Sequence, residues 1–166
     1  VHTFDCTVPD EKEYRDSIRV PRDIASRVLF YNKCINSRRE FGRLEQSRKS
    51  NGDYLPYEKS LDLAGITHGP TFLKMDVEGF EWNVLADIAG AGVRSPQQIS
   101  FELHYHKLSQ SLKWRRSYKN PSEIALLGEM LFRSGYVALH RRDNTYGTKG
   151  EAAEYLLAKV ADSGSM

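Results

Sequence analysis

The segment of residues 71–85, TFLKMDVEGFEWNVL, limits the possible folds of this chain more than any other segment. Its first five residues have the composition of a short buried strand, and that strand ends at Asp76. Gly79 lets the backbone turn, and an amphipathic helix follows whose apolar stripe consists of Phe80, Val84, Leu85 and Ile88. In open α/β sheets ligands bind at the carboxyl ends of strands, so we expect chemistry at this turn.

The rest of the chain also alternates between strand-like and helix-like segments. We predict strands at residues 2–8, 28–35, 71–75, 98–103, 136–139 and 153–160, and helices at 58–66, 79–88 and 120–135. Residues 10–26 have the composition of a polar linker and residues 37–57 that of a long loop. The last helix is expected to bury Ile124, Leu126, Leu127, Met130 and Leu131.

This order of elements predicts an α/β fold with a largely parallel sheet. The last two strands have no helix between them, so they are expected to pair antiparallel through a turn at residues 144–150. We expect one domain over residues 1–160, followed by a polar tail at 161–166.

Composition narrows the range of partners. With 166 residues, 40% of them hydrophobic, the chain has the size and apolar content of a globular domain. A net charge of +2 gives no reason to expect nucleic acid as a partner, and no apolar run approaches the roughly 20 residues of a membrane-spanning helix. Cys6 and Cys34 lack the CxxC spacing of a metal or redox site, which leaves free thiols and one disulfide both open. These features indicate neither the compartment nor the oligomeric state.

Two acidic positions follow predicted strands. Asp5 at the end of the first strand could accept hydrogen bonds from ribose hydroxyls, although a carboxylate that caps a turn is the commoner use of such a residue. Asp76 and Glu78 are followed by Gly79 and a predicted helix. They either stabilise the amino-terminal end of that helix or bind a ligand. Spacing alone leaves both interpretations open, and they do not exclude each other.

The fourth predicted strand ends in the sequence FELHYH, where alternation places Glu102, His104 and His106 on one face. Together with Asp76 and Glu78 they could form a divalent-metal site or an acid–base cluster. No HExxH or similar ligand spacing supports a metal, so histidines paired with carboxylates are the favoured interpretation and no metal is predicted.

A basic and aromatic segment at residues 113–119 follows this strand directly. Its composition suits phosphates, acidic sugars or bases, and a solvated surface loop is the alternative. We expect it at the same rim as Asp76, with Trp114, Arg115 and Arg116 as its ligand-facing residues.

The sequence LKMDVEGFEWNVL at residues 73–85 resembles the signature of FkbM-type and methyltransferase-like enzymes that use S-adenosylmethionine. The resemblance extends backwards to residues 1–7, which are similar to the second strand of that family, and forwards to residues 99–104, which are similar to its fifth strand. It implies a class I methyltransferase fold, Rossmann-like, with strand order 3-2-1-4-5-7-6 and S-adenosylmethionine bound over strands 1 and 2. The family's first strand and glycine-rich loop are expected upstream of Val1.

The resemblance also implies roles for individual residues. Asp5 falls where the family holds the cofactor ribose, and Asp76 falls beside the methyl group and the acceptor, with Glu78 shaping the cofactor rim. Asp76 or His104 is the candidate base. The acceptor side is bordered by Glu102, His104, His106, Trp114, Arg115 and Arg116.

Three functions follow from these observations. The first is methyl transfer to an oxygen or nitrogen of a small-molecule or sugar acceptor. The second is a non-catalytic α/β module that binds a partner through its basic loops. The third is a metal-dependent hydrolase that uses Asp76, Glu102, His104 and His106.

Overall fold

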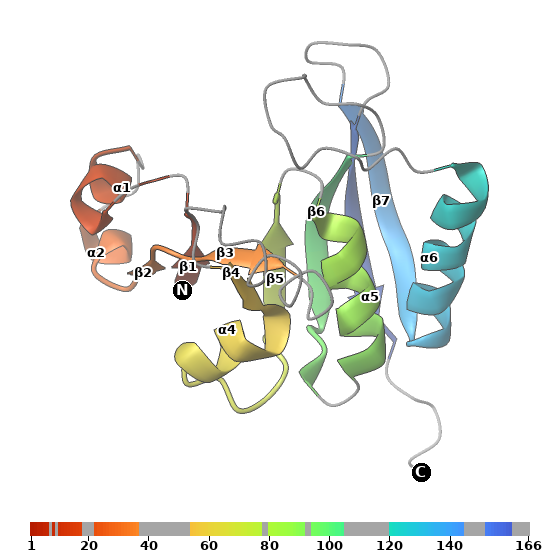
Figure 1. The fold of residues 1–166 in the computed structure, drawn as a ribbon, viewed down its shortest axis with the longest axis horizontal. Coiled ribbons are helices and arrows are strands. Elements are labelled where there is room, and N and C mark those ends of the chain that lie inside the picture. The colour runs from red at the N-terminus through yellow and green to blue at the C-terminus, as the bar shows by residue number, and fades with distance from the viewer. Residues whose placement is uncertain are drawn as a thin grey trace. The chain divides into compact units, whose positions relative to one another are not determined.

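A computed structural model describes residues 1–6, 8, 10–17, 22–36, 54–77, 80–91, 94–104, 120–144 and 152–160 of the protein (Figure 1). The chain divides into two compact units, Val1–Gly65 and Ile66–Met166, and each is described by itself. The predicted domain over residues 1–160 and the tail at 161–166 stay predictions.

The first unit begins with strand β1 (His2–Phe4), which pairs in parallel with β2 (Leu29–Tyr31). The connection contains helices α1 (Glu11–Ser17) and α2 (Arg22–Ala25), so the predicted polar linker at residues 10–26 is wrong. The Asp10 carboxylate caps α1 by accepting from the Glu13 N–H at 2.9 Å. Two i,i+4 ion pairs, Lys12–Asp16 and Arg15–Glu11, support a helix that is polar nearly all round.

A second parallel pair in this unit joins β3 (Cys34–Asn36) to β4 (Tyr54–Pro56). The single strand predicted at residues 28–35 is therefore wrong, because the Lys33 N–H donates to the Tyr31 carbonyl at 2.8 Å and turns the chain between β2 and β3. The strand β4 lies within the loop predicted at residues 37–57, whose residues 37–53 fall outside the described chain. Helix α4 (Tyr57–Leu63) confirms the short helix predicted at 58–66. Cys6 and Cys34 form a disulfide with a Cα–Cα distance of 4.9 Å.

The second unit contains a mixed sheet with strand order β5-β6-β8-β7. Strands β5 (Phe72–Met75) and β6 (Gln98–His104) are parallel, whereas β8 (Ala152–Lys159) runs antiparallel to both β6 and β7 (Tyr136–Asn144). The predicted α/β class and the antiparallel last pair are confirmed. The order also matches the 4-5-7-6 half of the sheet that the family resemblance implies.

Helices α5 (Glu81–Ala91) and α6 (Pro121–Arg133) lie side by side on one face of this sheet (Figure 1). Of the predicted apolar stripe, Val84, Leu85 and Ile88 are fully buried in α5, whereas Phe80 precedes the helix and is half-buried. The helix begins two residues later than predicted and continues to Ala91, three residues beyond the predicted end at residue 88.

The apolar face of α6 is narrower than predicted. Leu127 and Leu131 are buried, but Leu126 is 57% exposed, because it lies off the stripe that continues through Ile124, Leu127 and Leu131. A capping box of Asn120 and Glu123 begins the helix, as the predicted start at residue 120 requires.

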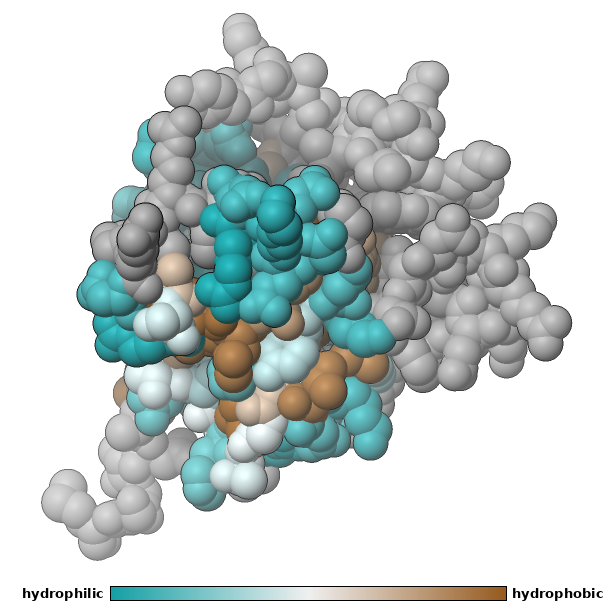
Figure 2. Space-filling view, turned by 90° about the vertical axis from the view of Figure 1, so that its left-hand side faces the viewer, coloured by the Kyte–Doolittle hydropathy of each residue, from teal (hydrophilic) through white to brown (hydrophobic). Residues whose placement is uncertain are grey.

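The surface shown in Figure 2 is largely hydrophilic with a smaller apolar area. Large apolar side chains of the first unit that are exposed include Ile24, Leu29 and Leu63. Within the described chain no helix has the length and apolarity to cross a bilayer.

Candidate active site

Three of the predicted site residues meet at the carboxyl ends of β5 and β6. Asp76 directly follows β5, and Glu102 and His104 lie in the last three residues of β6, which pairs with β5 in parallel. One oxygen or ring nitrogen from each of the three side chains lies within 4.8 Å of the other two. We call Asp76, Glu102 and His104 the β5–β6 cluster.

The three side chains of the β5–β6 cluster differ in their exposure to solvent. Asp76 is exposed, Glu102 is half-buried and His104 is only 5% exposed. The cluster is therefore open to solvent on the side of Asp76 and closed on the side of His104. A ligand that reaches these side chains would approach from the Asp76 side.

The inner residue, His104, is held by a carboxylate that sequence reasoning did not single out. Glu81 at the start of α5 is fully buried, and its Oε1 lies 3.1 Å from Nδ1 of His104. In the tautomer in which this carboxylate accepts from Nδ1–H, the neutral ring presents Nε2 as its basic nitrogen. The same Glu81 oxygen accepts from the Val77 N–H at 2.9 Å. Glu81 thereby connects the turn after β5 to the end of β6.

Two further contacts fix the surroundings of the β5–β6 cluster. The Trp82 indole N–H donates to the His104 carbonyl at 2.6 Å in a buried position. The Asn144 amide of β7 donates to Oε1 of Glu102. The backbone of His104 and the carboxylate of Glu102 are thus each positioned by a neighbouring element.

Glu81 carried a signal in the sequence. It occupies the same helical stripe as Val84, Leu85 and Ile88, all of which are fully buried. An acidic residue on an otherwise apolar stripe must have a buried partner, because an unpaired buried charge is too costly. The pairing predicted for the strand-end histidines exists at His104, and its carboxylate is Glu81.

Asp5 lies in the first unit, directly after β1. Its N–H donates to the Tyr31 carbonyl at 3.1 Å and continues the pairing of β1 with β2, and the residue is half-buried. A carboxylate at the carboxyl end of a parallel pair fits the ribose of a nucleoside cofactor.

The other predicted site residues fall outside the described chain. These residues are Glu78, His106, Trp114, Arg115 and Arg116.

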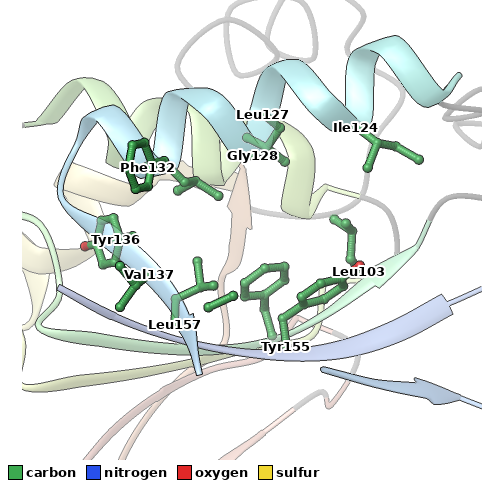
Figure 3. Close-up of a pocket in the computed structure, with 12 residues that line it drawn as sticks. Leu103, Ile124, Leu127, Gly128, Phe132, Tyr136, Val137, Tyr155 and Leu157 are labelled. Atoms are coloured by element: carbon green, nitrogen blue, oxygen red, sulfur yellow. The ribbon is translucent and has the colours of Figure 1, made fainter. Parts of the chain in front are cut away.

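A separate hollow of about 440 Å³ lies between α6 and the sheet of the second unit (Figure 3). Apolar side chains of α6, including Ile124 and Leu127, face Leu103 and Leu157 across it. The lining residues with a polar side chain are Tyr136 and Tyr155, and the hydroxyl of Tyr136 donates to the Pro96 carbonyl at 2.5 Å. Burial raises the pKa of Tyr136 from 10.0 to about 12. The hollow therefore offers apolar packing and no acid–base chemistry.

Comparison with known proteins gives one strong similarity. A family model described as "Methyltransferase FkbM domain" matches residues 21–136. No curated protein matches the chain.

Solved structures show weaker similarity. The fibrillarin pre-rRNA processing protein of Methanococcus jannaschii aligns with 82% of this chain at 17% identity and a TM-score of 0.44. EvdMO1 aligns with 96% of it at 17% identity, and an N-terminal domain of EvdMO1 with SAH bound aligns with 95% at 16% identity, both with a TM-score of 0.34. The chain spans 58% of the fibrillarin chain, 36% of EvdMO1 and 72% of the N-terminal domain. TM-scores at this level are too low to bear on function.

Proposed function

This chain belongs to the FkbM methyltransferase domain family, and we propose that the protein moves a methyl group from S-adenosylmethionine to an oxygen or nitrogen of a small molecule or sugar. The family match also supports the predicted class I methyltransferase fold. It favours methyl transfer over the non-catalytic module and the metal-dependent hydrolase as the function.

The observation that carries this proposal is the convergence of Asp76, Glu102 and His104 within 4.8 Å at the carboxyl ends of two parallel strands. S-adenosylmethionine supplies an electrophilic methyl group on a positively charged sulfur. A bond forms between the acceptor atom and the methyl carbon, the carbon–sulfur bond breaks, and S-adenosylhomocysteine leaves with the electron pair. The acceptor also loses a proton, which the protein has to receive.

Alignment and proton removal are the tasks that such a displacement sets for the protein. The β5–β6 cluster is suited to both tasks. Asp76 is exposed and can meet an acceptor from solvent, while His104 is oriented by Glu81 with Nε2 as its basic nitrogen. Asp76 and His104 are therefore the candidate bases, and Glu102 is a candidate hydrogen-bond acceptor for the substrate.

We assign the cofactor ribose to Asp5 in the first unit. Its position after β1 supports this role, because a carboxylate there can accept from both ribose hydroxyls. Glu78 is proposed to shape the cofactor rim, and the basic and aromatic segment around Trp114, Arg115 and Arg116 is proposed to meet the acceptor together with His106.

Calorimetric titration of the full-length protein with S-adenosylmethionine tests the cofactor assignment. We expect binding of one equivalent and a loss of affinity of about tenfold to a hundredfold in Asp5→Ala, because hydrogen bonds to a charged group are lost. The matched control is Asp16→Ala, which removes an exposed carboxylate of α1. Equal affinity in Asp5→Ala and Asp16→Ala would refute the ribose assignment, and no binding to the wild-type protein would refute the proposed function.

A further inference from the structure

We infer that Asp76, Glu102 and His104 bind one divalent metal ion of the manganese, iron or zinc type. The site rests on residues of the second unit alone. What the ion does for an acceptor rests on the proposed methyl transfer.

The first observation that supports a metal site is the geometry of the β5–β6 cluster. Metal ions of this type bind nitrogen and oxygen ligands at about 2.0–2.2 Å, which separates neighbouring ligand atoms by roughly 3–4 Å. The three candidate ligand atoms already lie within 4.8 Å of one another. The carboxylate of Asp76 is exposed, so it can move the short remaining distance without disturbing the core.

The orientation of His104 is a second and independent observation. Histidines that bind metal almost always donate their other ring N–H to a carboxylate or carbonyl, which fixes the tautomer and raises the basicity of the ligand nitrogen. Glu81 provides this support from α5, through Oε1 at 3.1 Å from Nδ1. Glu81 is fully buried, so it serves as an outer support and not as an exposed ligand. Asn144 supports Glu102 in the same way from β7.

The local charge also favours a cation. Three carboxylates, those of Asp76, Glu81 and Glu102, surround the single imidazole of His104. In addition, Glu102 lies opposite Glu154 in the β6–β8 register, although Arg142 of β7 faces Glu154 in turn. Like charges this close repel each other, and a divalent ion held by Asp76 and Glu102 would offset the repulsion between these two carboxylates.

The donor set indicates which ions fit. Imidazole suits zinc, iron and related ions, whereas magnesium and calcium prefer oxygen ligands alone. One imidazole with two carboxylates therefore favours Mn²⁺, Fe²⁺ or Zn²⁺. Three protein ligands leave coordination positions open, as in catalytic metal sites. A hydroxyl of the acceptor bound there would lose its proton more readily, since a bound cation lowers the pKa of a coordinated oxygen group. With one oxygen of Asp76 on the ion, its second carboxylate oxygen is the group that would receive this proton, so Asp76 and not His104 is the base when metal is bound.

Equilibrium dialysis of the full-length protein against MnCl₂, and separately against ZnCl₂, tests the site without any methyl acceptor. Bound Mn²⁺ is measured by electron paramagnetic resonance and total metal by emission spectrometry. We expect one equivalent per chain, an affinity at least tenfold lower in Glu102→Gln and Asp76→Asn, and a loss of tenfold to a hundredfold in Glu81→Gln through its support of His104. The matched control is Glu129→Gln, which changes an exposed carboxylate of α6 and is expected to leave metal affinity within twofold of wild type.

Two results would overturn the inference. One is wild-type protein that retains neither Mn²⁺ nor Zn²⁺, and the other is metal bound equally by Asp76→Asn, Glu102→Gln and Glu129→Gln. Asp76→Asn alters an exposed side chain, so the test stays decisive even if Glu81→Gln fails to fold. Cofactor titration of the same samples separates the two proposals. Protein that binds S-adenosylmethionine but no metal refutes this inference alone, and protein that binds metal but no cofactor refutes the methyl transfer alone.

Discussion

Glu81 and His104 form a buried pair in which the carboxylate Oε1 lies 3.1 Å from the imidazole Nδ1. The pair joins the first residue of α5 to the last residue of β6. Because Glu81 also accepts from the N–H of Val77, one side chain holds both the turn that carries Asp76 and the histidine beside it. The geometry of the β5–β6 cluster therefore depends on a residue outside it.

Replacing Glu81 by alanine should destabilise the protein by about 3 kcal/mol, because it leaves a buried imidazole N–H and a backbone N–H without their acceptor. Urea unfolding followed by circular dichroism measures this change. The control, Glu129→Ala, breaks an exposed pair with Arg133 and should cost no more than about 0.5 kcal/mol. Similar costs for the two variants would show that Glu81 does not hold His104.

Replacing Trp82 by phenylalanine keeps an aromatic ring in the core but removes the N–H that donates to the His104 carbonyl at 2.6 Å. The lost hydrogen bond and the smaller ring should together lower the unfolding free energy by about 1–3 kcal/mol. Amide hydrogen exchange should also rise at the end of β6. Unchanged exchange there would contradict the role given to this hydrogen bond.

Replacing each of two glycines in the second unit by alanine should change the stability of the protein in opposite directions. Gly128 lies within α6 beside the apolar hollow, and a Cβ at this position would meet no atom within 4 Å. Gly128→Ala should therefore raise stability by about 0.5–1 kcal/mol. Gly135 has a φ of +86°, where alanine is strained, so Gly135→Ala should lower stability by about 1 kcal/mol or more. Thermal unfolding of both variants measures the signs, and equal shifts would be inconsistent with the left-handed backbone conformation at Gly135.

The stability of the protein should decline between pH 10 and pH 12 partly through Tyr136. Burial raises the pKa of this hydroxyl to about 12, so the folded state keeps the proton while the unfolded state loses it from about pH 10. The stabilisation is complete below pH 10 and is lost as the pH rises to 12, with a maximum of roughly 3 kcal/mol for two pKa units. Tyr136→Phe should show a correspondingly shallower decline in urea unfolding over this range. Parallel declines for the two proteins would contradict the raised pKa.

Much of the second unit follows from its sequence pattern. The apolar run before Asp76, the stripe through Val84 and Ile88, and the period-two alternation at Glu102 and His104 are strong local signals, and each leads to the observed neighbourhood. That Asp76 lies near Glu102 could be predicted, because β5 and β6 are consecutive parallel strands and their carboxyl ends lie at the same edge of the sheet.

The first unit was harder to predict because its signals are weak or nonlocal. Helix α1 consists almost entirely of polar residues, so no apolar stripe reveals it, and its support comes from i,i+4 pairs such as Arg15–Glu11. The break between β2 and β3 depends on a single backbone hydrogen bond from Lys33 to Tyr31. Glu81 was passed over for a different reason. Its place on an apolar stripe indicates that it is buried, but its partner, His104, is identified only once the fold places that residue beside it.

The formation of S-adenosylhomocysteine is the most direct measure of whether the turn after β5 serves methyl transfer. The full-length protein would be incubated with saturating S-adenosylmethionine and a panel of sugars and small molecules bearing hydroxyl or amino groups, and products would be identified by their added methyl mass. We predict acceptor-dependent turnover that falls at least a hundredfold in Asp76→Asn and stays unchanged in Asp62→Asn, an exposed carboxylate of α4 paired with Lys59. Equal turnover in Asp76→Asn and wild type would contradict this account.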